Sequence, residues 1–197
     1  KLAELEALLG PLNIRLLVPA DVGGIPAVDE DEESFAGNAR KKASSAARAT
    51  ARWALADDSG LEVEALGGEP GVRSARYAGV HGDDAANNRA LLAALVGLPP
   101  ERRGARFVCA LALADPTGRI EFETLGPARG RILAAARGER DFGYDPLFLF
   151  TEAGHGATGR AFAEITPQEK ALVSHRGRAL RQLMEHLAHG NCLRSTI

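Results

Sequence analysis

Two adjacent acidic side chains, Asp57 and Asp58, follow the apolar run of residues 53–56 and precede Ser59 and Gly60. Catalytic groups of α/β proteins commonly lie at the ends of strands. Neighbouring carboxylates repel each other, so a protein that keeps both ionised usually supplies a cation, and hard oxygen ligands favour Mg²⁺ or Mn²⁺. The pair therefore indicates a metal-dependent enzyme. A solvated turn is the alternative on this stretch alone, because Asp, Ser and Gly are common turn residues.

The composition limits the classes of protein to which the chain can belong. Its 197 residues, 45% of them hydrophobic, suffice for one sizeable core, so a single domain is expected. With 24 basic and 26 acidic residues, the net charge of -2 offers no general surface for nucleic acid or for an anionic membrane. No apolar run approaches the about 18 residues of a membrane span, and residues 1–6 are typical of a helix rather than a signal peptide. A cytoplasmic protein is expected, without nucleic-acid or membrane partners.

The elements around the Asp pair follow from apolar spacing and capping residues. Leucines at helical spacing predict a helix over residues 2–9, and residues 14–18 are typical of a short strand. An acidic run at residues 29–33 precedes Ser34, a candidate N-cap, and the Ala-rich segment 35–52 has strong helix propensity. The acids suit the positive end of that helix dipole.

The second half of the chain predicts a hairpin and two further helices. Residues 84–96 are typical of a helix, and the runs 106–113 and 119–125 flank turn-forming residues at 115–118. Ile132 and Leu133 could add a third strand, and residues 142–150 form the next apolar run. Thr166 begins a capping box that opens a helix, whose continuation through Ser174 is undecided. We expect an α/β fold with a mixed, central twisted sheet flanked by helices and including an antiparallel hairpin.

Polar side chains recur in glycine-rich or apolar settings along the chain. These stretches are Ala56-Asp57-Asp58-Ser59-Gly60-Leu61, Leu66-Gly67-Gly68-Glu69-Pro70-Gly71, Ser74-Ala75-Arg76-Tyr77, Asp141-Phe142-Gly143-Tyr144-Asp145-Pro146, Phe162-Ala163-Glu164-Ile165, Glu169-Lys170 and Ser174-His175-Arg176-Gly177. Together they resemble the inosine/xanthosine triphosphate pyrophosphatase family, and their order and spacing agree over nearly the whole chain. Members of that family hydrolyse non-canonical purine nucleoside triphosphates to monophosphates and pyrophosphate.

The resemblance implies one pyrophosphatase domain over residues 1–197, with an active-site cleft between two lobes, a tail from residue 189 and a homodimer. Family members open with a strand and a Thr-x-Asn-x-x-Lys phosphate loop, so Lys1 resembles the last residue of that loop and the strand is expected to precede it. Family members also carry Phe-x-Glu-Asn-Ala where this chain has Phe35-Ala36-Gly37-Asn38-Ala39. Gly37 puts any role of that carboxylate in doubt.

The resemblance also implies the roles of the acidic residues. Water would attack the α-phosphorus and pyrophosphate would leave, so the protein positions the reactants and neutralises phosphate charge. Asp58 is the candidate general base and metal ligand, and Glu30 and Asp57 are further candidate ligands for Mg²⁺, with Mn²⁺ as a possible substitute. Because consecutive strand residues face opposite sides, one Asp is favoured over the pair.

The remaining candidates would bind the purine nucleotide. Lys1 and Lys170 are expected at the phosphates, and Ser59 could hydrogen-bond a phosphate oxygen. Phe142 and Tyr144 could supply a stacking face, although both being core residues is the alternative. His175 and Arg176 would donate to a 6-oxo group, which adenine lacks. The expected substrate-binding residues are Lys1, Ser59, Phe142, Gly143, Tyr144, Asp145, Lys170, His175 and Arg176.

Two other functions stay open at this point. The chain could be a pyrophosphatase for modified pyrimidine triphosphates, or a nucleotide-binding regulatory protein whose catalysis has lapsed. The absence of the Gly-x-x-x-x-Gly-Lys-Ser/Thr and Gly-x-Gly-x-x-Gly motifs argues against a P-loop NTPase and a dinucleotide-binding protein. Cys109 and Cys192 have no spacing that would indicate a metal site or a disulfide framework.

Overall fold

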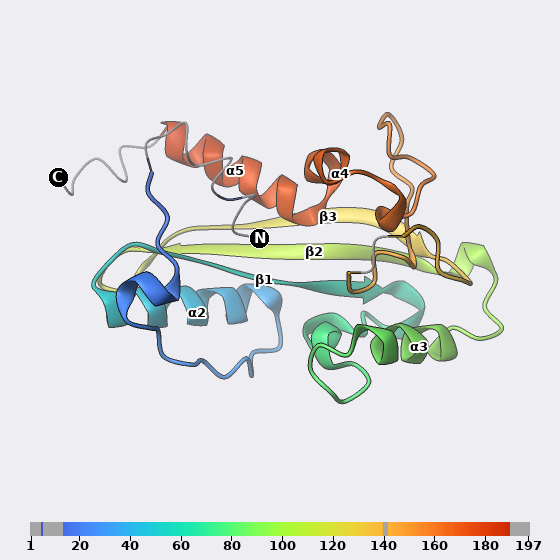
Figure 1. Ribbon diagram of the computed structural model, residues 1–197, viewed down its shortest axis with the longest axis horizontal. Helices are drawn as coiled ribbons and strands as arrows, with labels where there is room; N and C mark the ends of the chain where they lie inside the picture. Colours follow the sequence, from blue (N-terminus) through green and yellow to red (C-terminus); the bar gives the residue numbers. More distant parts are fainter. Residues whose placement is uncertain (1–4, 6–13, 140–141, 190–197) are drawn as a thin grey trace. The chain divides into compact units, whose positions relative to one another are not determined.

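The structure is a computed structural model that describes residues 5, 14–139 and 142–189 (Figure 1). The chain divides into two compact units. The first comprises Lys1–Asp58, Ala110–Leu125 and Arg178–Ile197, and the second Ser59–Cys109 and Gly126–Gly177. This agrees with the expected division into two lobes, whereas the single functional domain and the cleft between lobes stay predictions. The helix expected at residues 2–9 lies outside the described residues, apart from Leu5, which is helical.

Four strands form one sheet in the order β1-β2-β3-β4. They are β1 (Ala54–Val63), β2 (Gly104–Ala114), β3 (Ile120–Ile132) and β4 (Phe148–Phe150). A tight turn joins β2 to β3, in which the Asp115 carboxylate accepts hydrogen bonds from the Thr117 and Arg119 backbone N–H groups at 2.9 and 3.0 Å. β3 pairs antiparallel with β4, Gly130 lying opposite Phe150. The predicted hairpin is therefore confirmed.

Two strand predictions were wrong. Residues 14–18 alternate in exposure and Val18 is extended, but the structure assigns these residues to no strand, and a 3₁₀ turn begins at Pro19. Alternation predicts a pleated segment, yet only a hydrogen-bonded neighbour makes it a strand. Ile132 does not start a third strand, because it is the last residue of β3, which continues beyond the predicted end at residue 125.

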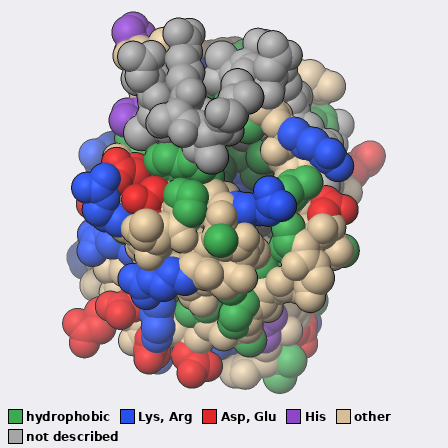
Figure 2. All heavy atoms as spheres, turned by 90° about the vertical axis from the view of Figure 1, so that its left-hand side faces the viewer, with side chains coloured by type: hydrophobic (Ala, Val, Ile, Leu, Met, Phe, Trp, Pro, Cys, Tyr) green, Lys and Arg blue, Asp and Glu red, His purple; other side chains and the backbone are tan. Residues whose placement is uncertain are grey.

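Helices α2 (Phe35–Thr50) and α5 (His175–His189) contribute to the first unit. Ser34 caps α2, its hydroxyl accepting a hydrogen bond from the Gly37 N–H at 3.1 Å, as predicted. Ala39, Ala43 and Ala47 are fully buried, so the small side chains of one stripe let α2 pack closely. Figure 1 shows α2 and α5 on opposite faces of this unit's part of the sheet. Arg40 and Arg48 of α2 are exposed. Figure 2, which views the left-hand side of Figure 1, shows basic and acidic side chains interspersed on that face.

The second unit contains α3 (Asp84–Ala94), α4 (Pro167–Val173) and most of the aromatic core. The Phe107 and Phe148 rings lie 4.7 Å apart and the Phe148 and Phe162 rings 4.8 Å apart, in tilted contacts. Shorter 3₁₀ turns complete the described chain: Pro19–Val22, Glu64–Leu66, Gly71–Arg76, Pro100–Arg102 and Phe162–Glu164. None of the described helices is both long enough and apolar enough to cross a membrane.

A sharp corner separates α4 from α5. The predicted capping box opens α4: the Glu169 N–H donates to the Thr166 hydroxyl at 3.2 Å, and the Thr166 N–H donates to the Glu169 carboxylate at 2.7 Å. Ser174 is extended and ends α4, and its hydroxyl accepts a hydrogen bond from the Gly177 N–H at 3.1 Å. A Cβ at Gly177 would lie 1.9 Å from the Ala171 carbonyl oxygen. The corner therefore depends on a glycine at this position.

Candidate functional site

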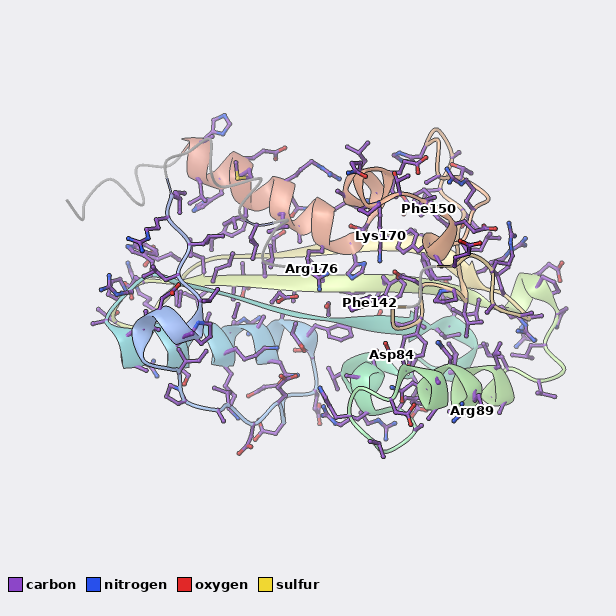
Figure 3. The ribbon with its side chains drawn as sticks, viewed as in Figure 1. Asp84, Arg89, Phe142, Phe150, Lys170 and Arg176 are labelled. Atoms are coloured by element: carbon purple, nitrogen blue, oxygen red, sulfur yellow. The ribbon has the colours of Figure 1, made fainter. Side chains whose placement is uncertain are left out.

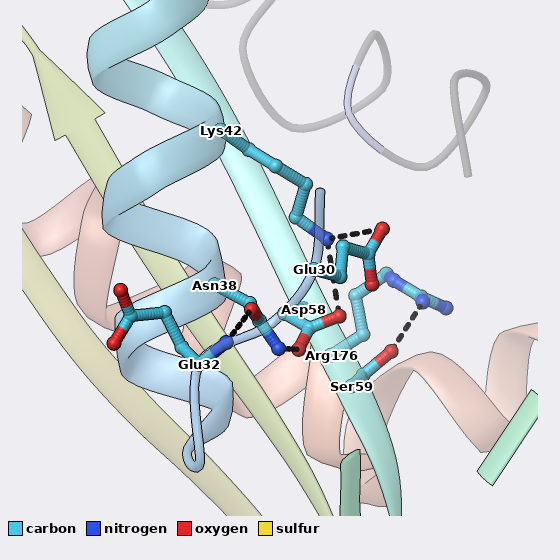
Figure 4. A network of polar contacts seen from close by, with 7 residues as sticks. All are labelled: Glu30, Glu32, Asn38, Lys42, Asp58, Ser59 and Arg176. Atoms are coloured by element: carbon cyan, nitrogen blue, oxygen red, sulfur yellow. Dashed lines mark hydrogen bonds and ion pairs between the residues drawn. The ribbon is translucent and has the colours of Figure 1, made fainter. Parts of the chain in front are cut away.

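The first unit brings Glu30, Asn38, Lys42 and Asp58 together, a group that we call the Asp58 cluster (Figure 4). The Lys42 ammonium lies 3.0 Å from Oδ1 of Asp58 and 3.5 Å from Oε1 of Glu30. The Asn38 amide donates to Oδ2 of Asp58 at 3.1 Å. Both oxygens of the Asp58 carboxylate are thus engaged, and a second carboxylate shares the same cation.

Helix α2 positions two members of the Asp58 cluster, because Asn38 and Lys42 are four residues apart and so lie on one face. Asn38 is only 1% exposed. Its carbonyl oxygen accepts a hydrogen bond from the Glu32 N–H at 3.1 Å, which leaves its amide nitrogen to face Asp58. Asn38 therefore links the acidic segment to strand β1.

The Asp58 side chain is only 12% exposed, and this burial raises the pKa of its carboxyl group. The Lys42 ammonium and the Asn38 amide lower that pKa, while the negative charge of Glu30 raises it, and the net direction is upward. A carboxylate with a raised pKa accepts a proton more readily, which suits a general base.

The donor set of the Asp58 cluster fits a magnesium ion. Among the described residues, no group of three or more His, Cys, Asp or Glu side chains could hold a metal. Mg²⁺ usually takes one or two protein carboxylates and completes its shell with water and substrate phosphates. Glu30 and Asp58, which already share one cation, match that requirement. No group of three such side chains that includes Asp57 is present among the described residues, and the expectation that Asp57 and Asp58 face opposite sides of the strand stays a prediction.

In the second unit, five residues form what we call the Lys170 cluster: Ser59, Phe142, Asp145, Lys170 and Arg176. Figure 3 labels Phe142, Lys170 and Arg176. Lys170 makes an ion pair with Asp145, and its ammonium lies 5.6 Å from the Phe142 ring centre. Arg176 donates to the Ser59 hydroxyl at 3.3 Å. Burial raises the pKa of Asp145, while Lys170 and Arg176 lower it. Two cations and an exposed aromatic ring could bind an anionic, aromatic ligand.

The two aromatic candidates have different environments. Phe142 is 63% exposed and presents its ring to solvent. Tyr144 is only 6% exposed and belongs to the core, where its hydroxyl donates to the Ser74 carbonyl at 2.9 Å. Only Phe142 could therefore stack on a base, and the core alternative applies to Tyr144. His175 is also buried, its ring stacked on Phe107 at 4.8 Å.

The structure describes only some of the remaining residues that the sequence analysis considered. Lys1 and Cys192 lie outside the described residues. Cys109 is buried within β2. Sequence reasoning missed Lys42, because a lysine in an Ala-rich helix is typical of a solvated surface. Its spacing of four residues from Asn38, in a helix that follows an acidic run, was the available signal.

The Glu32 side chain lies beside Gly37, where a larger side chain at position 37 would extend. A Cβ at Gly37 would lie 2.8 Å from Cβ of Glu32 and 3.0 Å from one of its carboxylate oxygens. The Glu32 side chain therefore occupies the space beside the first turn of α2. A larger residue at position 37 would displace this side chain.

Known proteins and a family profile match this chain over almost its whole length. Residues 1–186 match the profile of the Ham1 family. The dITP/XTP pyrophosphatase of Rhodopirellula baltica is 46% identical over 187 residues, covering 95% of this chain and 88% of the relative, and that of Desulforamulus reducens is 48% identical, covering 95% and 90%. A crystal structure of a nucleoside-triphosphatase or dITP/XTP pyrophosphatase from Mycobacterium abscessus has a TM-score of 0.77 and 45% identity, covering 94% and 93%. A HAM1 protein from Coxiella burnetii has a TM-score of 0.85 and 38% identity, covering 96% and 93%.

Proposed function

This chain belongs to the Ham1 family, and on that premise we propose how its own side chains carry out the reaction. The chain is a nucleoside triphosphate pyrophosphatase, which hydrolyses non-canonical purine nucleoside triphosphates to the monophosphate and pyrophosphate. The pyrimidine and regulatory alternatives are not favoured, since the relatives are named dITP/XTP pyrophosphatases. The observation that carries the mechanism is the Asp58 carboxylate, largely buried and held by Asn38 and Lys42.

Asp58 is the general base of the proposed reaction. Its carboxylate accepts a proton from a water molecule, whose oxygen forms the new bond to the α-phosphorus. The bond from the α-phosphorus to the bridging oxygen breaks, and that oxygen leaves with pyrophosphate. Asn38 and Lys42 hold the two carboxylate oxygens, so the base is oriented before the substrate binds.

We assign the metal ligands to Glu30 and Asp58. Magnesium, or manganese in its place, would neutralise negative charge on the phosphate oxygens. The support is that both carboxylates contact one ammonium group, so this part of the protein already accommodates a positive charge between them. Lys42 balances the two carboxylates when they have no other cation.

The Lys170 cluster is proposed to bind the purine base and phosphate oxygens of the nucleotide. Lys170 and Ser59 contact phosphate oxygens, with Lys1 expected to do the same, and Phe142 stacks on the purine. His175 and Arg176 donate to the 6-oxo group. ATP carries an amino group at that position, so a hydrogen-bond donor of the base would face the donors of the protein. Polar groups left unpaired in this way can discriminate against ATP by roughly 10⁴-fold. Gly143 and Asp145 belong to the segment that carries Phe142.

The homodimer and the cytoplasmic location are also proposals, which rest on the family resemblance and on the composition. Size-exclusion chromatography with light scattering tests the dimer. The decisive experiment for the function is to incubate the purified protein with ITP, dITP, XTP and ATP in Mg²⁺ and to separate the products. We expect pyrophosphate and monophosphate from the first three. Orthophosphate as the product, or equal turnover of ATP, would contradict the proposal.

A further inference from the structure

Helix α3 holds the backbone of Gly143 at both of its polar groups. The Gly143 N–H donates to Oδ2 of Asp84 at 2.8 Å, and the Gly143 carbonyl accepts a hydrogen bond from the Asn88 amide at 2.9 Å. Asp84 and Asn88 are four residues apart and so lie on one face of α3. Neither residue belongs to the stretches that identify the family in this sequence. We call this arrangement the Gly143 clamp.

The next two residues of the segment are also fixed, but by other partners. Tyr144 is anchored in the core through its hydrogen bond to the Ser74 carbonyl, and Asp145 is paired with Lys170. Phe142, by contrast, is exposed and has its ring within 5.6 Å of the Lys170 ammonium. Figure 3 shows Asp84 on the side of α3 that faces Phe142. The clamp therefore acts on the backbone immediately next to the one aromatic side chain of this segment that a ligand can reach.

Gly143 needs such support because of its conformation. Its φ of +56° lies in the left-handed region, where glycine has no steric penalty, and a Cβ there would have no atom within 4 Å. Glycine without side-chain packing leaves the backbone free to turn, and with it the direction of the preceding side chain. Two hydrogen bonds to one peptide segment remove that freedom before a ligand arrives.

We propose that Asp84 and Asn88 are positioning residues, which orient Phe142 through Gly143 and so set the affinity of the enzyme for the purine base. This inference rests on the proposed function, because it assumes that Phe142 stacks on the base. Ordering the aromatic face in the free enzyme lowers the entropy lost on binding. The clamp acts on binding of the base and not on the attack at phosphorus, so it affects KM more than kcat.

The test compares steady-state kinetics with ITP for the wild type, Asn88→Ala and Asp84→Asn. Losing the Asn88 donor leaves the Gly143 carbonyl without its partner, and we expect KM to rise about tenfold with kcat changed less than about twofold. Asp84→Asn keeps the shape and one acceptor oxygen but loses the charge, so we expect a smaller rise in KM. Arg89→Ala is the matched control, since Arg89 is an exposed neighbour on α3 that points away from Phe142, and its KM should equal that of the wild type (Figure 3).

A double-mutant cycle separates positioning from general destabilisation. In a Phe142→Ala background, Asn88→Ala should raise KM no further, because the side chain that it orients is gone. A fall in kcat or in melting temperature with KM unchanged, or a full KM effect in the Phe142→Ala background, would overturn the inference.

Binding of the product IMP, measured by calorimetry without metal, should weaken about tenfold in Asn88→Ala, and unchanged IMP affinity would also overturn the inference. Failure of the wild type to hydrolyse ITP would refute the proposed function separately, while the IMP measurement would still test the clamp.

Discussion

Replacing Asp58 with asparagine should abolish most of the catalysis and leave the fold nearly intact. The amide has the shape of the carboxylate and can still accept a hydrogen bond, but it cannot take a proton from water. General-base catalysis contributes about 10² to 10⁴ in rate, so we expect kcat for pyrophosphate release from ITP to fall by about 10³-fold.

The effect of Asp58→Asn on stability follows from two opposing contributions. A hydrogen bond to a charged group, such as that between Lys42 and Asp58 at 3.0 Å, contributes about 1.5 to 3 kcal/mol. Burial of the carboxylate works against folding in the ionised form, and because the net pKa shift is upward it outweighs that gain. Lys42 also keeps its contact with Glu30. We therefore expect no loss of stability beyond about 1 kcal/mol, so that Tm changes by less than about 4 °C.

The assay couples pyrophosphate release to a colour reaction at saturating ITP and Mg²⁺, alongside thermal melts of each variant. Asp57→Asn is the matched control, because strand alternation predicts that the neighbouring carboxylate faces the other side of β1, and we expect its kcat to remain within about threefold of the wild type. Near-normal turnover in Asp58→Asn would remove Asp58 from its role as base. An equal loss in both variants would show that the pair acts together.

The other predictions concern the metal, the base and the pH dependence of folding. Chelation with EDTA should stop ITP hydrolysis and excess Mg²⁺ should restore it, whereas undiminished turnover in chelator would argue against the proposed carboxylate ligands. His175→Ala or Arg176→Ala should raise KM for ITP relative to ATP, and an unchanged ratio would show that they do not contact the base. The Thr166 N–H and Arg160 lower the pKa of Glu169 from 4.5 to about 2, so its contribution to stability is present above about pH 4.5 and is lost as the pH falls toward 2. Melting temperatures between pH 2 and 5 should therefore fall less steeply for Glu169→Gln than for the wild type, and parallel curves would contradict this.

Local signals in the sequence predicted the elements that depend on neighbouring residues. The turn at residues 115–118, the cap at Ser34 and the capping box at Thr166 each involve hydrogen bonds spanning four residues or fewer, and all three are present. The strand expected at residues 14–18 failed because a strand requires a partner far away in the sequence, which the local pattern cannot supply.

The candidate site was predictable in its residue types and less so in its contacts. Asp58 and Glu30 could be named from the sequence, but the cation that they share, Lys42, comes from the middle of a helix that resembles ordinary surface. The burial of Tyr144 and the exposure of Phe142, two residues apart, depend on Ser74 and the aromatic core rather than on the residues themselves. The clamp on Gly143 joins segments 55 and 59 residues apart, beyond the range of any spacing rule.

The corner between α4 and α5 restricts how the specificity of this enzyme could be re-engineered. A mutagenesis library aimed at base preference would naturally randomise His175 and Arg176 together with the residue that follows them. At Gly177 even a methyl group would collide with the Ala171 carbonyl, so most members of such a library would be lost to misfolding before their selectivity could be measured. Holding this one position constant while varying its two predecessors would keep the library productive, and natural variation in base selectivity at this corner faces the same restriction.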